Sequence, residues 1–199
     1  CAVLTGTGSA LNYANARAGE AILVIGAGGV GLAAVQGARS QGASPIAVID
    51  PSEAARAGAI RSGATHAVAP GAEGEAALLE LTKGRGFDAV IDMVAFSATY
   101  ETAWRLTRRG GTIVVVGVSP RSQANPIPIV DIALTGRKLV GCVYGGSSIH
   151  RDIPRYAAMA ERGELDFDAL LGRTITLDEA PAILMASEPL PGRTVVVNR

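Results

Sequence analysis

The chain has 199 residues, of which 48% are hydrophobic and 18% charged, with a formal net charge of zero. This composition is that of a soluble globular protein, long enough for one large domain or a domain with a smaller lobe. The charge balance argues against a nucleic-acid partner, which selects a basic surface. Two cysteines make no disulfide framework, and Arg17 and Glu20 interrupt the N-terminus before a signal-peptide core, so we expect a cytoplasmic protein.

The first element of interest is the uncharged stretch 21–38, which is just long enough to raise the question of a membrane span. Four glycines fall within six positions of it: Gly26, Gly28, Gly29 and Gly31. Each costs a helix about 1 kcal/mol relative to alanine. They divide the stretch into a strand at 21–25 and a helix at 31–42. We therefore expect no membrane segment here.

Residues 26–31 read G-A-G-G-V-G and match the pattern G-x-G-x-x-G directly after a strand. In this pattern Gly26 permits a tight turn, Gly28 lets a pyrophosphate approach the backbone, and Gly31 lets helix and strand pack closely. The free N–H groups at the start of the helix then face the anion. The motif predicts a dinucleotide-binding turn.

Asp50 ends the next apolar run, nineteen residues after Gly31. A carboxylate at this place accepts hydrogen bonds from the hydroxyls of an adenosine ribose. The alternative is that Asp50 caps the helix that begins at 51–53. A carboxylate would also repel a ribose 2′-phosphate, and Arg56 is expected to lie one helical turn further on. We therefore expect NAD to be preferred over NADP.

The remaining pattern alternates helices with apolar strands. Helices are predicted at 52–63, 73–84 and 97–111, and strands at 46–50, 66–69, 87–94, 112–118 and 139–143. Four glycines mark expected helix ends: Gly42, Gly63, Gly84 and Gly110. Continuous apolar runs, without alternation, are typical of strands that are covered on both faces. The fold class is therefore α/β, a Rossmann-type, doubly wound, parallel six-stranded sheet.

After the fifth strand the pattern changes. Residues 120–128 contain three prolines and predict a surface loop. From 146 onward a helix (151–165), a strand (173–177), a second helix (178–188) and a closing strand (193–198) form a C-terminal α/β appendage. We therefore divide the chain into a nucleotide-binding domain, 1–145, and an appended segment, 146–199. The sixth strand, Leu139 to Val143, is an apolar edge, and pairing with a second copy would cover it in a homodimer.

These segments together resemble the zinc-dependent, medium-chain alcohol dehydrogenases. Residues 1–43 resemble the family's segment from a metal-ligand cysteine into the coenzyme domain, and 110–118 its fifth strand. The segments 150–154, 163–184 and 192–198 resemble its C-terminal end. The resemblance covers essentially all 199 residues, whereas the family's N-terminal catalytic lobe has no counterpart in them. Ala95 stands where the family usually has glycine.

The resemblance implies a set of site residues. Cys1 matches a ligand of the catalytic zinc, although zinc needs three or four ligands and one cysteine does not make a site. Thr5 matches a catalytic residue beside the nicotinamide. The cofactor-binding residues implied are Gly26, Gly28, Gly29, Val30, Gly31, Asp50, Val116, Gly117, Val118, Tyr144 and Arg193. Arg193 reaches the pyrophosphate in this reading, while the alternative is a solvated side chain.

Other polar residues are expected to be structural. Asp92 should be hydrogen-bonded near the end of a buried strand, and Arg108 and Arg109 should lie at a helix end, where cations suit the dipole. His66, beside a short central strand, and His150, at the start of a helix, are also expected to be structural.

The function implied is hydride transfer between NAD and a small-molecule alcohol or carbonyl compound, with zinc in the whole enzyme and no turnover by this chain alone. Two alternatives stay open. One is a zinc-free, NADPH-dependent quinone or enone reductase of the same superfamily. The other is a non-catalytic Rossmann module that senses nucleotides.

Overall fold

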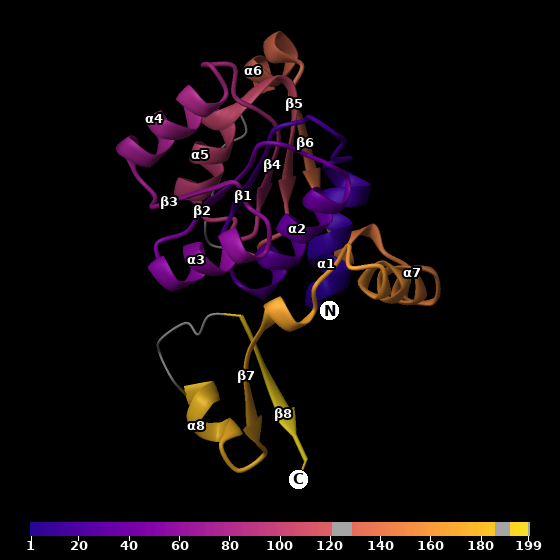
Figure 1. The fold of residues 1–199 in the computed structure, drawn as a ribbon. Coiled ribbons are helices and arrows are strands. Elements are labelled where there is room, and N and C mark those ends of the chain that lie inside the picture. Colours follow the sequence, from indigo (N-terminus) through magenta and orange to yellow (C-terminus); the bar gives the residue numbers. More distant parts are fainter. Residues whose placement is uncertain (121–128, 186–191, 199) are drawn as a thin grey trace.

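The computed structural model describes residues 1–120, 129–185 and 192–198 (Figure 1). Six parallel strands form one sheet in the order β3-β2-β1-β4-β5-β6. Their bounds are β1 (Ile22–Ile25), β2 (Ile46–Ile49), β3 (His66–Val68), β4 (Phe87–Asp92), β5 (Thr107–Val115) and β6 (Lys138–Gly141). The strand order reverses between β1 and β4, which creates a crevice at the carboxyl ends of the strands. The predicted Rossmann-type α/β fold is confirmed.

The central strand β1 explains why the sequence pattern is continuous instead of alternating. Its successive side chains point to opposite faces of the sheet. Ile22 and Val24 join a hydrophobic cluster with α2 and α3, and Leu23 and Ile25 join a second cluster with α4 and α5. All four side chains are buried. Both faces of β1 are therefore covered by helices, as the fold requires.

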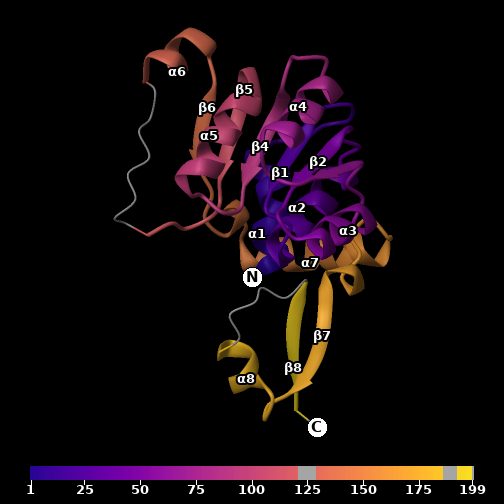
Figure 2. The same cartoon turned by 90° about the vertical axis from the view of Figure 1, so that its left-hand side faces the viewer.

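Helices α2 and α3 cover one face of the sheet and α4 and α5 the other, whereas α8 lies beside the pair formed by the last two strands (Figure 2). The bounds of the helices are α1 (Ala2–Gly8), α2 (Gly29–Ser40), α3 (Glu53–Arg61), α4 (Ala72–Leu81), α5 (Ser97–Leu106), α6 (Ile129–Thr135), α7 (Ile149–Glu161) and α8 (Ala180–Met185), with a π-helical turn at Ser9–Tyr13 and 3-10 turns at Tyr144–Gly146 and Asp168–Leu170. In the part of the chain that the structure describes, none of these helices has the length and apolarity to cross a membrane.

Helix α1 was not predicted from the sequence. It packs against α2 because its glycine positions allow the backbones to approach. A Cβ on Gly6 would lie 2.1 Å from the carbonyl oxygen of Val30, and one on Gly8 would lie 2.4 Å from that of Gly145. Small residues here replace the large apolar side chains by which a helix is usually recognised.

The structure corrects several predicted boundaries and the position of one strand. Helix α5 ends at Leu106, so Arg108, Arg109 and Gly110 lie in β5 and not at a helix end. The reason is tertiary, because Thr107 already pairs with the start of β4 and Arg108 donates to the carboxylate of Asp88. The sixth strand is Lys138–Gly141 rather than Leu139 to Val143. Strand β3, which carries His66, is at the edge of the sheet and not in its centre.

Of the four glycines predicted to end helices, three do so and one lies inside a strand. Gly42, Gly63 and Gly84 follow helix ends with positive φ values of 74°, 107° and 75°, as C-terminal caps do. Gly110 also has a positive φ, but inside β5.

The C-terminal segment contacts the rest of the described chain at several places. Tyr156, Met159 and Leu165 form a small core against Val3, Leu4 and Leu11, so α7 lies beside α1 (Figure 1). Further on, the buried amide of Gln36 donates to the backbone oxygen of Asp166 at 2.8 Å and accepts from its N–H at 2.9 Å.

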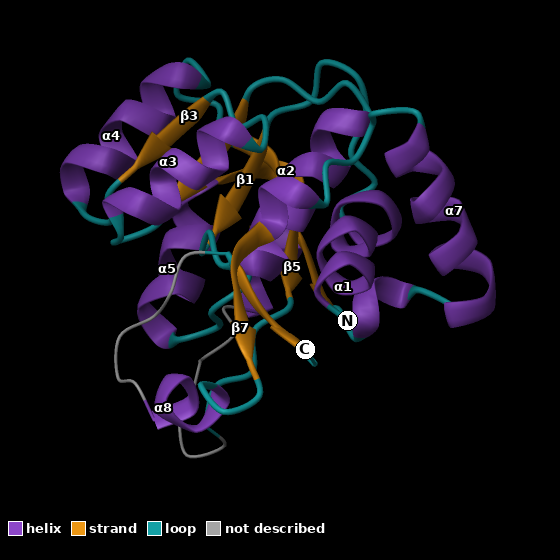
Figure 3. Cartoon of the chain, turned by 60° about the horizontal axis from the view of Figure 1, so that its bottom comes forward, coloured by secondary structure: helices purple, strands orange, loops and turns teal. Residues whose placement is uncertain are grey.

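Beyond Asp166 the chain forms a parallel pair of strands, β7 (Leu171–Thr176) and β8 (Arg193–Val197). The pair lies below the carboxyl ends of the six-stranded sheet in Figure 1 and in front of the sheet in Figure 3. The predicted loop at 120–128 lies outside the described residues except for Pro120, as does the end of the helix predicted at 178–188. The proposed division at 145/146 stays a prediction.

Candidate functional site

The glycine turn between β1 and α2 has the geometry that the motif predicts. Gly26 has φ +96° and donates its N–H to the oxygen of Ile49 at 2.8 Å. A Cβ on Gly31 would lie 1.9 Å from the oxygen of Gly26, so the turn and helix touch backbone to backbone. A Cβ on Gly28, the N-cap of α2, would meet nothing within 4 Å. The N-terminus of α2 therefore has an open approach for an anion.

The carboxylate of Asp50 connects this turn to the end of β2. One oxygen accepts from the N–H of Ala27 at 2.7 Å, and the other accepts from the N–H of Ser52 at 2.8 Å. The cap of α3 is Ser52, whose hydroxyl accepts from the N–H of Ala55 at 3.3 Å. The alternative role of Asp50 as the helix cap is therefore taken by Ser52, which the sequence analysis missed, although serine is a preferred N-cap residue.

Arg56 lies one helical turn after Ser52, as expected, but its side chain turns back toward the end of β2. Its guanidinium reaches back and donates to the backbone oxygens of Asp50 and Pro51, at 2.8 and 2.9 Å. A positive charge therefore lies beside the end of β2, where the sequence analysis expected only a carboxylate. This placement weakens the reason for expecting NADP to be rejected.

A cavity of about 290 Å³ opens at the same edge of the sheet, and the sequence analysis did not predict it. Its floor includes Ile25 and Ile49, the last residues of β1 and β2, and its walls come from α4, α5 and the segment before α4. The lining residues are Ile25, Ile49, Pro70, Gly71, Glu75, Ala98, Thr99, Glu101, Thr102 and Arg105. The lining combines the apolar ends of β1 and β2 with polar and charged side chains of α4 and α5, at the sheet edge where α/β folds bind small ligands.

Arg193 lies against the glycine turn, although 164 residues separate it from Gly29 in the chain. A Cβ on Gly29 would sit 2.1 Å from Cδ of Arg193. The first residue of β8 thus places its side chain against the N-terminus of α2. The structure brings together the two features that the resemblance linked.

The residues after β5 lie next to the end of β4. The N–H groups of Val116 and Gly117 donate to the oxygen of Asp92 at 2.9 and 3.1 Å. A Cβ on Gly117 would lie 2.4 Å from the backbone carbon of Val94, while Val118 is 94% exposed. Val116, Gly117 and Val118 therefore follow the strand, whereas the sequence analysis placed them inside it.

Asp92 organises the turn that these residues contact. Its buried carboxylate accepts from the N–H groups of Val94 and Ala95 at 2.9 Å each and from the hydroxyl of Thr99 at 2.9 Å. Burial raises the pKa of Asp92, against the lowering effect of these hydrogen bonds. Ala95, where the family usually has glycine, adopts φ +60°. The expected structural role of Asp92 matches this geometry.

Cys1 and Thr5 lie one turn apart on α1. The Sγ of Cys1 is 3.9 Å from the Oγ1 of Thr5, and Cys1 is exposed. Tyr144 is 62% exposed, and the following residue, Gly145, lies against the backbone of Leu4 and Thr5. Among the described residues, no three metal-binding side chains cluster. Cys1 is thus available as a ligand, but the described residues do not form a zinc site.

The chain is similar to zinc-binding alcohol dehydrogenases. A family model described as "Zinc-binding dehydrogenase" matches residues 29–162. A geraniol dehydrogenase of Castellaniella defragrans is 33% identical over 189 residues, covering 94% of this chain and 50% of the relative. The benzyl alcohol dehydrogenase structure from Acinetobacter calcoaceticus has 25% identity and a TM-score of 0.92, covering 100% of this chain and 55% of that one.

The structure of a zinc-binding dehydrogenase from Sinorhizobium meliloti 1021, bound to NADP, has 26% identity to this chain and a TM-score of 0.83. The match covers 98% of this chain and 57% of that one. The chain spans about half the length of the curated relatives it matches. The family model covers well over half of the chain and includes the start of α2, β4, β5 and α7. The chain therefore belongs to the zinc-binding dehydrogenase family, and it corresponds to the coenzyme-binding part of the medium-chain alcohol dehydrogenases.

Proposed function

We propose that the chain binds NAD at the carboxyl edge of its sheet, as the coenzyme half of an alcohol dehydrogenase that acts on a small-molecule alcohol or carbonyl compound. The observation that carries this proposal is the carboxylate of Asp50, which is hydrogen-bonded to the tip of the glycine turn. This contact places an anionic hydrogen-bond acceptor at the end of β2, beside the open N-terminus of α2.

The residues present fit such a coenzyme. The N–H groups at the start of α2, left open at Gly28 and flanked by Arg193, would hold the pyrophosphate. Asp50 would accept from the ribose hydroxyls, and the cavity of about 290 Å³ would take the adenine. Thr5 and Tyr144 would flank the nicotinamide end.

Further contacts to the nicotinamide end would come from Val116, Gly117 and Val118. The turn that holds the pyrophosphate would be formed by Gly26, Gly29, Val30 and Gly31. The bound coenzyme accepts or donates the hydride, and these residues bind and orient it.

The choice between NAD and NADP depends on two opposite charges. The Asp50 carboxylate disfavours a 2′-phosphate, while the Arg56 guanidinium, which donates to the backbone oxygens of Asp50 and Pro51, favours one. We propose NAD because the carboxylate lies at the turn itself. The position of Arg56 is the observation that favours the second candidate, a zinc-free NADPH-dependent reductase.

Cys1 is proposed to contribute one ligand to a catalytic zinc. Further ligands would have to come from outside the described residues, since these contain no group of three or more His, Cys, Asp or Glu side chains that could hold a metal ion. The chain by itself is accordingly expected to bind coenzyme without oxidising alcohols.

We also propose a homodimer through β6. This strand is at one edge of the six-stranded sheet, and Val143, just beyond it, is 72% exposed. Pairing of two β6 edges would continue the sheet across a twofold axis. Sedimentation velocity should give the mass of a dimer, and a monomer at high concentration would contradict the proposal.

Calorimetric titration with NAD and NADP at matched ionic strength tests the coenzyme proposal. NAD is expected to bind with a Kd between micromolar and low millimolar values, and D50N to weaken it by about tenfold, the scale of one charge-assisted hydrogen bond. The exposed Glu53, in the first turn of α3, provides the matched control E53Q, which changes the same charge away from the turn.

R56A should leave NAD binding unchanged. If the chain prefers NADP and R56A loses that preference, the proposed coenzyme would be NADP and the reductase would become the favoured function. Equal weakening by D50N and E53Q would refute the role of Asp50.

A further inference from the structure

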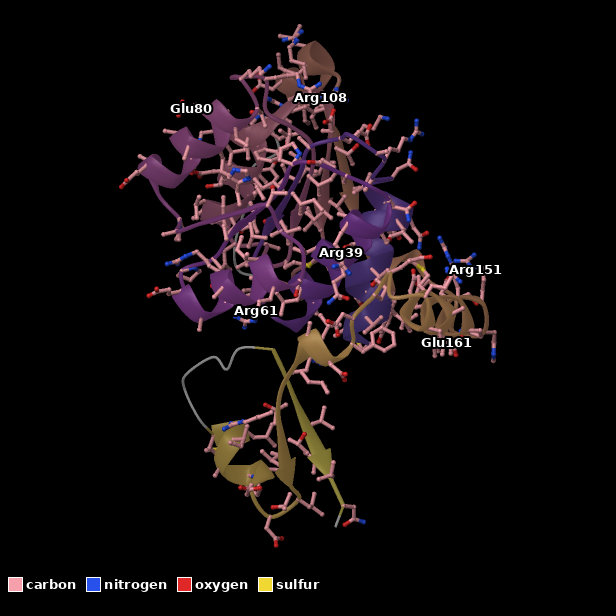
Figure 4. All side chains as sticks on the ribbon, in the orientation of Figure 1. Arg39, Arg61, Glu80, Arg108, Arg151 and Glu161 are labelled. Carbon is pink, nitrogen blue, oxygen red and sulfur yellow. The ribbon has the colours of Figure 1, made fainter. Side chains whose placement is uncertain are left out.

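A second cavity, of about 590 Å³, lies at the amino-terminal edge of the sheet, opposite to the glycine turn. Of its eight lining residues five are arginines: Arg85, Arg105, Arg108, Arg109 and Arg137. They come from the loop after α4, from α5, from the first residues of β5 and from the residue just before β6. Figure 4 shows Arg108 at the end of the molecule where α6 lies, opposite to the β7–β8 pair.

The carboxylates around this cavity neutralise only part of its charge. The carboxylate of Asp88 forms ion pairs with two arginines, Arg85 at 3.1 Å and Arg108 at 2.5 Å. The guanidinium of Arg105 donates two hydrogen bonds to the carboxylate of Glu75, at 2.8 and 3.0 Å. None of the described lining residues is acidic. Five guanidinium groups against these two carboxylates leave an excess of positive charge, which Glu101 and Asp131 nearby reduce to one net charge.

Arg109 and Arg137 carry this excess. Within the described ranges, neither has a carboxylate at ion-pair distance, and both bind backbone oxygens instead. Arg109 donates to the oxygen of Leu134 at 2.6 Å, and Arg137 donates twice to that of Thr107, at 2.9 and 2.6 Å. These carbonyls hold the two side chains in place without neutralising them.

The surroundings of Arg137 show that the two charges act on each other. Its guanidinium stacks on the ring of Trp104, 5.1 Å from the centroid. Burial lowers the pKa of Arg137 and the charge of Arg109 lowers it further, while Asp131 acts in the opposite direction. Glu101, 3.9 Å from Arg105, and Asp131 reduce the positive excess but do not remove it. An anion between Arg109 and Arg137 would relieve their repulsion.

We propose that this cavity binds a multiply charged phosphate, of the pyrophosphate or polyphosphate class, at a site separate from the coenzyme. A guanidinium presents two parallel N–H groups that match the oxygens of a phosphate, so fixed arginines recognise this group better than a point charge does. The volume is within the range of small-ligand sites. Arg105 lines both this cavity and the one proposed for the adenine, whereas Arg109 and Arg137, which would hold the phosphate, line only this one.

The test must separate this cavity from the glycine turn, which would also attract pyrophosphate. Gly28 makes the separation simple, because a Cβ there meets nothing within 4 Å and its φ is −68°, so G28E should fold and place a carboxylate at the anion approach. Titration of G28E with sodium pyrophosphate at fixed ionic strength then reports on the arginine cavity. The same variant should lose NAD binding, which tests the coenzyme proposal independently.

In the G28E background, R109Q/R137Q should weaken pyrophosphate binding at least tenfold. The control R17Q/R61Q removes the same charge from two exposed arginines elsewhere and should leave the affinity unchanged. If R109Q/R137Q unfolds at a lower temperature than the wild type, the variant R109K/R137K replaces it. The lysines keep the two charges but lack the planar guanidinium groups, so pyrophosphate binding should still weaken. Loss of all pyrophosphate binding in G28E alone, or equal losses in the glutamine pair and its control, would overturn the proposal.

Discussion

Gly31→Ala tests the physical basis of the glycine turn, because the added methyl has no room. The Cβ would lie 1.9 Å from the oxygen and 3.0 Å from the carbon of Gly26, where Cβ contacts below 3.0 Å essentially never occur. Both neighbouring atoms belong to the backbone, so no side chain can rotate away. Helix α2 and the turn would have to separate by about 1 Å, which is the kind of overpacking that costs roughly 1–3 kcal/mol.

The expected magnitude follows from two opposing effects. Alanine favours a helix over glycine by about 1 kcal/mol. The steric cost should lie at or above the upper end of its range because the contact is with rigid backbone, so the net loss should be about 2 kcal/mol. For a chain of this size, that loss corresponds to a fall in Tm of about 4–8 °C.

Thermal unfolding followed by circular dichroism at 222 nm measures this fall. Gly28→Ala is the matched control in the same motif, since its Cβ meets nothing within 4 Å and its φ of −68° suits any residue. Its cost should stay below about 1 kcal/mol, the difference between glycine and alanine at an N-cap. If G31A melts with the wild type, or if both variants melt equally early, the close approach of Gly31 and Gly26 is not what constrains the turn.

Two further predictions concern side chains that hold the fold together. Burial acts to raise the pKa of Asp88, but hydrogen bonds from Arg108 and a backbone N–H, with the charges of Arg85 and Arg108, lower it below its ordinary value. Its contribution is therefore complete above about pH 4 and is lost as the pH falls through the lowered pKa. Asp88→Asn should cost about 1–3 kcal/mol in urea unfolding at pH 7 and almost nothing well below pH 4, and a pH-independent difference would contradict this. Gln36→Leu removes both hydrogen bonds to Asp166 and should cost about 1–3 kcal/mol and speed amide exchange at Asp166, whereas unchanged exchange would show that these bonds do not anchor the segment.

The sheet was predictable because its signal is local. Most strands contain a short apolar run, and the helices before β2, β3 and β4 end near Gly42, Gly63 and Gly84, which adopt positive φ. Helix α1 gave no such signal, because the segment Ala2–Gly8 buries glycines and threonine against α2 instead of a stripe of large apolar residues.

The boundary between α5 and β5 was wrong for a related reason. The sequence after Leu106 has two arginines followed by glycine, which is typical of a helix end. The pairing of Thr107 with Phe87 and the contact of Arg108 with Asp88 decide otherwise. These contacts join residues twenty positions apart, and no local pattern contains them.

The candidate site also has features that a local sequence pattern predicts and features that depend on side-chain conformation or long-range contacts. The glycine turn is a local motif, and the structure has the predicted geometry there. The position of Arg56 depends on how a long side chain folds back over its own helix, which spacing alone does not reveal. The contact of Arg193 with Gly29 was accessible only through the resemblance to a family, because no pattern within the sequence links residues so far apart.

Asp50 shows why two readings of one residue need not exclude each other. Its oxygens accept from Ala27 on one side and from Ser52 on the other, so the carboxylate stabilises the turn before any ligand binds. An ionised carboxylate has about four lone-pair sites, and these two hydrogen bonds leave acceptor capacity on both oxygens for ribose hydroxyls. The same group would then fix the position of the glycine turn and bind the ribose beside it. Folding of the turn and coenzyme affinity should therefore change together when Asp50 is replaced, whereas substitutions at the open Gly28 should affect affinity alone.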